Sequence, residues 1–206
     1  MKSQSKIAAA LQQPPGAQRN ALLYAVIRAI NDQKYQVSGD EVDDVLDTHF
    51  REIEQSSTVD GTFIRLWWRI LKHAPPNDRL KKLATTVLEH PRANCRREAL
   101  LYLLGHYPDE QTVLLKRWEN DPDAYVQYGL AMFLAGQSPA QALVHLKRIL
   151  ELEGVPHELA ETTPVFMAQC ATVHDLHEWD AKDQQLGGDT VWGEAACLLR
   201  ERLKKT

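Results

Sequence analysis

HPRANCRREALLYLLGHYPDEQTVLLKRW, residues 90–118, recurs 31 residues later as DPDAYVQYGLAMFLAGQSPAQALVHLKRI, residues 121–149. The two stretches align without a gap, and nine of their 29 positions are identical. The identical pairs include Pro91/Pro122, Gly105/Gly136 and Pro108/Pro139. Periods of this size are typical of stacked helical repeats, in which one unit cannot bury its apolar face alone. The sequence therefore predicts an all-α protein, a right-handed α-solenoid of antiparallel helix pairs with about ten helices.

Apolar residues recur at helical spacing along most of the chain, and no alternating run is long enough to predict a strand. Helices are expected at 18–29, 40–54, 61–71, 78–89, 93–104, 109–119, 122–135, 139–152 and 189–204. Gly105 and Gly136 are expected to end two of these helices. Pro164 is expected to begin a helix that extends through Val173, and Asp189 to cap the last one.

The repeat also predicts the domain organisation. We expect a single α-solenoid domain over residues 1–206, with the clearest repeats at 78–105 and 109–136. The units towards the two ends are expected to be degraded, because terminal repeats must cover the core with a polar outer face.

The two best units resemble the HEAT-repeat family, especially its short bacterial form. The matching residues are Asp121, Pro122, Val126, Leu134 and Gly136 in one unit and Pro91, Arg96, Ala99, Leu103 and Gly105 in the other. The departures are His90 in place of an aspartate and Gln127 in place of an arginine. The clear resemblance covers roughly 60 residues. It implies a fold that binds other macromolecules along a groove lined by the second helices of its repeats.

Composition narrows the class of protein. The net charge of −4 argues against a dedicated nucleic-acid binder. The three cysteines are widely spaced and form no CxxC pair, which indicates a reducing compartment and no zinc site. The apolar run Ile7–Leu11 is too short for a signal peptide, and no run is long enough to span a bilayer. We therefore expect a cytoplasmic protein with no membrane partner, no metal and no cofactor.

Charge is distributed unevenly along the chain. Residues 40–54 contain seven acidic residues against Arg51 alone, whereas residues 65–97 contain nine basic residues and two acidic ones. The candidate partner-binding residues are Arg65, Trp68, Arg69, Arg96, Arg97, Asp40, Asp43, Asp44 and Asp47. Such charges would steer a partner to a docking surface. Alternatively, the acidic and basic helices pair with each other, or Arg96 makes hydrogen bonds between repeats.

Two further patterns have an ordinary structural interpretation beside a functional one. Trp67 and Trp68 point about 100° apart on a helix, so one is expected in the core and the other at a boundary or a binding surface. His174, His177 and Glu178 lie close enough in sequence to resemble metal ligands, but they lack the HExxH pattern. A polar surface helix or loop is the better interpretation of that segment.

Two classes of function remain open from the sequence. The first is a non-enzymatic interaction protein that docks a protein partner through charged surfaces, for example a bacterial immunity protein that neutralises a toxin with its acidic helix. The second is a HEAT-like DNA glycosylase for alkylated bases, with Arg65, Arg69, Arg96 and Trp67 or Trp68 in a basic groove. A chaperone-like lyase for a chromophore is a third, family-level option. No GxSxG, P-loop or GxGxxG motif occurs.

Overall fold

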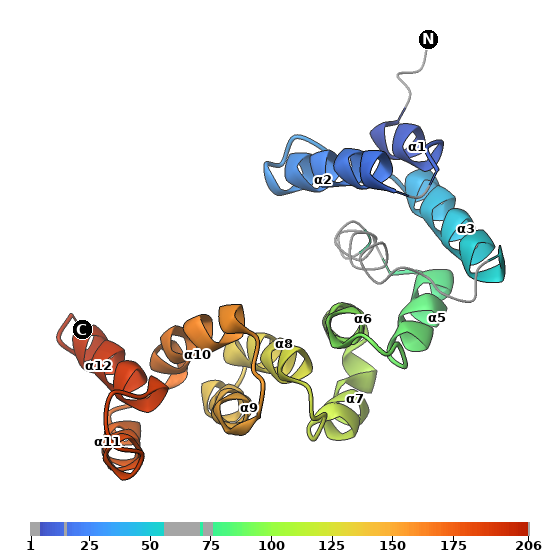
Figure 1. Ribbon diagram of the computed structural model, residues 1–206. Helices are drawn as coiled ribbons and strands as arrows, with labels where there is room; N and C mark the ends of the chain where they lie inside the picture. The colour runs from blue at the N-terminus through green and yellow to red at the C-terminus, as the bar shows by residue number, and fades with distance from the viewer. Residues whose placement is uncertain (1–4, 15, 56–70, 72–75, 206) are drawn as a thin grey trace. The chain divides into compact units, whose positions relative to one another are not determined.

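The computed structural model describes residues 5–14, 16–55, 71 and 76–205, with the backbone alone at 49, 50 and 52–55. All regular structure in these ranges is helical (Figure 1), which confirms the all-α prediction. The chain divides into two compact units, Met1–His106 and Tyr107–Thr206. The solenoid arrangement and the single domain stay predictions. None of the described helices is both long and apolar enough to cross a membrane.

The first unit contains five described helices. They are α1 (Lys6–Leu11), α2 (Ala17–Asn31), α3 (Gly39–Gln55), α5 (Asp78–Val87) and α6 (Ala93–His106). Helix α1 packs against α2 and α3, and α5 packs against α6. The six residues of α1 are too few to show a helical period, and the sequence did not predict this helix. The helix expected at 61–71 lies outside the described residues apart from Leu71, which is buried.

The second unit is built around one apolar core. Its elements are the 3₁₀ turn η1 (Pro108–Glu110) and the helices α7 (Gln111–Trp118), α8 (Ala124–Ala135), α9 (Pro139–Glu151), α10 (His157–Cys170), α11 (Asp175–Gln185) and α12 (Val191–Leu203). Helix α9 packs against α8 and α10, and α12 packs against α10 and α11. Trp179 and Trp192 are buried in this core.

The turn of the 31-residue repeat has the same local structure in both copies. Helices α5 and α7 end at equivalent positions, and α6 and α8 begin at equivalent positions. The N–H of His90 donates to the carbonyl of Val87 at 3.0 Å, and the N–H of Asp121 donates to that of Trp118 at the same distance. The sequence repeat is thus a repeat of backbone conformation.

The helix boundaries predicted at Gly105, Pro164 and Val173 are wrong. Helix α6 continues through Gly105 to His106. Helix α10 runs from His157 to Cys170 and passes through Pro164. A proline inside a helix removes one backbone donor. In the turn before it, the hydroxyl of Thr163 donates to the carbonyl of Leu159 at 2.6 Å. The helix continues through Pro164, which is buried.

The cap of the last helix is displaced by one residue from the prediction. Thr190, not Asp189, is the N-cap of α12, and its hydroxyl accepts from the N–H of Trp192 at 3.2 Å. Asp189 instead has a φ of 60° and belongs to the preceding turn. Asp183 accepts from the N–H and the hydroxyl of Thr190 at 2.9 and 2.7 Å. Hydrogen bonds from Thr190 lower the pKa of Asp183.

Candidate functional site

The acidic stripe is the exposed face of α3. It consists of Asp40, Asp43, Asp44 and Asp47. Residues three or four positions apart share one side of a helix, and the valines and leucine between them are buried on the other side. Arg79 of α5 lies against the stripe and binds Asp43 at 3.0 Å and also Asp47. At this contact the acidic and basic helices pair with each other. A partner-binding role for the stripe stays a prediction.

Among the acidic residues of α3 whose side chains the structure describes, Glu41 is the exception, because its side chain is buried. One carboxylate oxygen accepts from the hydroxyls of Ser5 and Tyr35, and the other accepts from the N–H of Ser38 at 2.9 Å. Burial opposes ionisation, but the hydrogen bonds from Ser38, Ser5 and Tyr35 hold the pKa of Glu41 below its ordinary value. Ser5 also caps α1. Glu41 therefore ties α1 to the start of α3.

The predicted basic surface is only partly described. Arg65, Trp67, Trp68 and Arg69 lie outside the described residues. Arg96 and Arg97 are on α6, and both are partly buried. The Nη1 of Arg96 donates to the carbonyls of His90 and Pro91, both at 3.0 Å. The Nη2 of Arg97 donates to Glu98 at 2.5 Å. Arg96 thus holds the turn that precedes its own helix.

Gln127 on α8 occupies the position 31 residues after Arg96. Its Nε2 donates to the carbonyl of Asp121 at 2.7 Å, six residues back, as Arg96 does to the carbonyl of His90. A second bond reaches the carbonyl of Glu119 at 3.2 Å. The replacement of the expected arginine by glutamine therefore leaves the hydrogen bond of the turn in place.

His145 of α9 is the buried partner of Gln127. Its Nδ1 lies 2.7 Å from the Oε1 of Gln127, and the residue is only 8% exposed. The carbonyls of Glu119 and Asp121 can only accept, so the amide nitrogen of Gln127 faces them and its oxygen faces the imidazole. Nδ1 therefore carries the proton, and Nε2 of the neutral ring is an acceptor. Burial lowers the pKa of His145, and the charge of Arg148 lowers it further.

An open cleft of about 710 Å³ lies between α7 and α9, and His145 is part of its lining. Its charged residues are Lys116 and Glu119, from α7 and the residue after it, and Arg148 from α9. The guanidinium of Arg148 also donates to the carbonyl of Glu119, which holds it at this position. The volume is typical of sites that bind small ligands.

Two exposed valines occupy equivalent positions of the repeat, and one of them lines this cleft. Val113 of α7 is 70% exposed and Val144 of α9 is 57% exposed. Val144 lines the cleft, and Val113 follows Thr112, which also lines it. Exposed apolar side chains on the helices that line a cleft favour an interaction site there. We call the cleft, the two valines, Lys116 and Arg148 the α7–α9 face.

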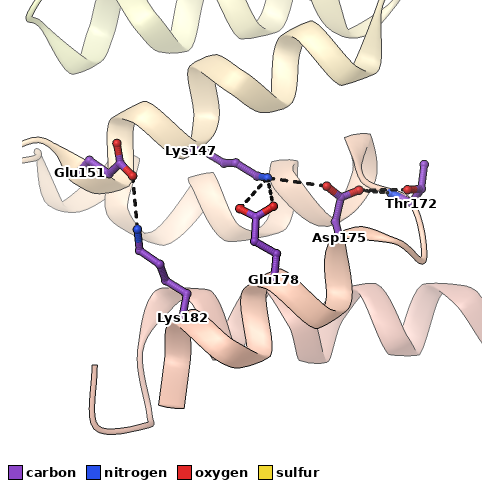
Figure 2. Close-up of polar contacts among 6 residues, drawn as sticks. All are labelled: Lys147, Glu151, Thr172, Asp175, Glu178 and Lys182. Carbon is purple, nitrogen blue, oxygen red and sulfur yellow. Dashed lines mark hydrogen bonds and ion pairs between the residues drawn. The ribbon is translucent and has the colours of Figure 1, made fainter. Parts of the chain in front are cut away.

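Helices α9 and α11 are bridged by ion pairs at the repeat spacing (Figure 2). The Nζ of Lys147 lies 2.8 Å from Glu178 and 3.7 Å from Asp175, and the Nζ of Lys182 lies 3.4 Å from Glu151. Glu178 follows Lys147 by 31 residues, and Lys182 follows Glu151 by the same number. The period of the repeat is therefore also visible in contacts between α9 and α11.

The segment with His174 and His177 is a polar surface helix, as the sequence indicated. Both histidines are exposed, and Glu178 binds Lys147. Within the described part of the chain, no three His, Cys, Asp or Glu side chains are placed to hold a metal ion.

The sequence marks Gln127 only as a departure from the repeat and does not single out His145, although the repeat contains a signal for both. His145 stands in the position of Leu114, and Gln127 stands in the position of Arg96. A polar residue in a position that is leucine in the other copy needs a hydrogen-bond partner when it is buried. Gln127, which replaces the arginine of the other copy, supplies that partner for His145.

The chain thus presents an acidic stripe on α3 and, in its second unit, a cleft built around a buried histidine. Neither can be assigned by similarity, because no family model, curated protein or solved structure matches the chain.

Proposed function

We propose that this chain is a non-enzymatic interaction protein that binds an acidic segment of a protein partner on the α7–α9 face. The observation that carries the proposal is the exposure of Val113 and Val144 at equivalent repeat positions, with Val144 in the lining of the cleft and Val113 on α7, which also lines it. Lys116 and Arg148 outnumber Glu119 among the charged residues of its lining, so the face favours an acidic partner.

The energies indicate that both parts of the face are needed. Full burial of one valine contributes about 1.5 kcal/mol or somewhat more, so two valines contribute roughly 3 kcal/mol. Micromolar affinity corresponds to about 8 kcal/mol, and association also costs translational and rotational freedom. The remaining free energy must come from the cleft and its charged residues.

We also propose that the helices continue the HEAT-like α-solenoid pattern. The matching turns at His90 and Asp121 support it, and so do the ion pairs between residues one repeat apart. The free thiols of Cys95, Cys170 and Cys197 support a reducing, cytoplasmic setting.

The two narrower hypotheses receive less support than the α7–α9 face. A toxin-neutralising role would use the acidic stripe, but Arg79 already binds Asp43 and Asp47 there. The glycosylase alternative would use Arg96 in a groove, whereas this side chain donates to two backbone carbonyls.

Selection from a displayed library of random peptides tests the docking proposal. We expect the selected peptides to be enriched in Asp or Glu next to Leu, Ile or Val, and their binding to weaken as salt is added. Val113→Ser combined with Val144→Ser should abolish this binding. Val173→Ser is the matched control, because Val173 is 55% exposed and lies outside the face. Selection of basic peptides, or equal binding by the double variant, would refute the proposal.

A further inference from the structure

We propose that the cleft holds the carboxylate of an acidic side chain at His145, and that Nε2 of His145 takes up a proton from solvent when this carboxylate binds. The inference deepens the proposed docking function and rests on it for the source of the carboxylate. It names the atom that would anchor the partner and makes its binding depend on pH.

The geometry of the histidine carries the inference. His145 is more than nine-tenths buried, and its Nδ1 is held by Gln127, which is itself fully buried and fixed by two backbone carbonyls. Among the described residues, Nε2 has no hydrogen-bond partner, although His145 lines the cleft. A buried imidazole that is oriented in this way and has one open nitrogen is a typical anchor for a ligand.

The surrounding charges determine the sign of the ligand. Lys116 and Glu119 line the cleft from the α7 side, and Arg148 lines it from α9, so the lining has an excess of one positive charge. Burial most of all, and then the positive charge of Arg148, lowers the pKa of His145, whereas the charge of Glu119 raises it. A bound carboxylate would offset the repulsion from Arg148 and accept a hydrogen bond from the protonated Nε2.

The coupling between carboxylate and proton is reciprocal. If the carboxylate favours protonation of His145, then protonation must favour the carboxylate by the same factor. Couplings of this kind typically change affinity by about 5-fold to 150-fold. We therefore expect the ligand to bind about fivefold or more tightly at pH 5.5 than at pH 7.5.

NMR titration of the intact protein tests the inference. The probes are N-acetyl-aspartate methylamide, which offers one side-chain carboxylate, and sulfate, which offers a tetrahedral oxyanion of constant charge in this pH range. We expect the aspartate probe to shift the ring nitrogens of His145 and to bind more tightly at pH 5.5. No binding at either pH, or equal binding at both, would overturn the inference. Binding of sulfate alone would overturn the carboxylate assignment.

Two variants and a control separate the roles of the side chains. His145→Gln keeps a donor for Gln127 but cannot take up a proton, so the pH dependence of binding should disappear. Lys116→Met should weaken binding at both pH values. Lys205→Met is the control, because Lys205 is exposed and lies outside this cleft. A pH dependence of probe binding that persists in His145→Gln would contradict the role of His145.

A further variant distinguishes failure of this inference from failure of the docking proposal. Val113 is not part of the cleft lining. Val113→Ser should therefore leave binding of the aspartate probe unchanged while it weakens the selected peptides. If the peptides bind and the probe does not, the docking proposal survives without the histidine anchor. If the probe binds and no peptides are selected, the anchor survives without the docking proposal.

Discussion

His145 shows how a position can be apolar in one repeat and polar in the next without loss of the fold. The equivalent residue is Leu114, and both residues are buried. The polar version is tolerated because Gln127 accepts a hydrogen bond from its ring. Leucine would therefore fit the repeat pattern at position 145 but not its present surroundings.

We predict that His145→Leu lowers the free energy of unfolding by about 1–3 kcal/mol, because the Oε1 of Gln127 would remain buried without a donor. His145→Gln should retain most of the stability, because its amide N–H can replace the ring N–H. Urea denaturation of both variants at pH 8, followed by circular dichroism, measures the difference. A leucine variant as stable as the wild-type protein would show that the contact with Gln127 contributes little.

His145 should also make the stability of the protein depend on pH. Its pKa is lower in the folded protein than in the unfolded chain, so the unfolded chain binds a proton more readily. Its contribution to stability is complete above the unfolded pKa, about 6.5, and is lost as the pH falls through that value towards the folded pKa. Burial lowers the pKa of His90 as well. The contribution of His145 is therefore measured by comparing the wild-type protein with a variant that lacks this histidine.

Urea denaturation of the wild-type protein and His145→Gln between pH 8 and pH 5, in a buffer without carboxylate or sulfate, isolates this contribution. We expect the wild-type protein to lose more stability than the variant over this range. Parallel curves would contradict the lowered pKa of His145.

At the scale of the helix, α3 is fixed by its polar side chains as well as its apolar ones. Glu41 ties its first turn to α1, and Arg79 of α5 binds Asp43 and Asp47 on its exposed face. The acidic residues of α3 thus differ in role although they look alike in sequence. A charge-reversal test of the stripe as a docking surface must separate them.

We predict that Asp43→Lys combined with Asp47→Lys destabilises the protein, because it replaces two attractions to Arg79 with repulsions. These residues are about half exposed, so the cost should be about 1 kcal/mol, and it should shrink at high salt. Asp40→Lys combined with Asp44→Lys changes the charge equally and should cost less than about 0.5 kcal/mol. Thermal denaturation at low and high salt compares the two. Equal destabilisation would show that the contacts of Arg79 are not the cause.

Helix boundaries show what local sequence can and cannot predict. The helix expected at 78–89 begins where it was predicted, and the side chain of Asn77 just before it accepts from the N–H of Leu80 at 2.8 Å. Such a cap is a contact within four residues, so the sequence contains it in full. Pro164 was misinterpreted as a helix start because it is buried within α10, and a local pattern does not reveal such packing.

At the scale of the whole molecule, the 31-residue period predicted the helical class and the shared turn of the two best repeats. It did not predict the cleft, because a cleft depends on which side chains of different helices meet. The candidates chosen by charge were partly residues whose charge is used internally, such as Asp43 with Arg79 and Arg97 with Glu98. The repeat marks Gln127 as a departure, and the replacement of Leu114 by His145 in the second copy is the corresponding signal for the histidine.

The bridge between α9 and α11 has a consequence for where the cleft lies. Lys147 and Glu151 face Glu178 and Lys182, so a slip of one helical turn would bring like charges together (Figure 2). The order of these four charges therefore favours one alignment of the two helices over its neighbours. One repeat earlier the equivalent residues are Lys116 and Asn120. They cannot form the same two ion pairs with Lys147 and Glu151. Lys116 and Asn120 both line the cleft. A repeat protein can thus gain a cleft for a ligand where two neighbouring helices lack such ion pairs, without any additional helix.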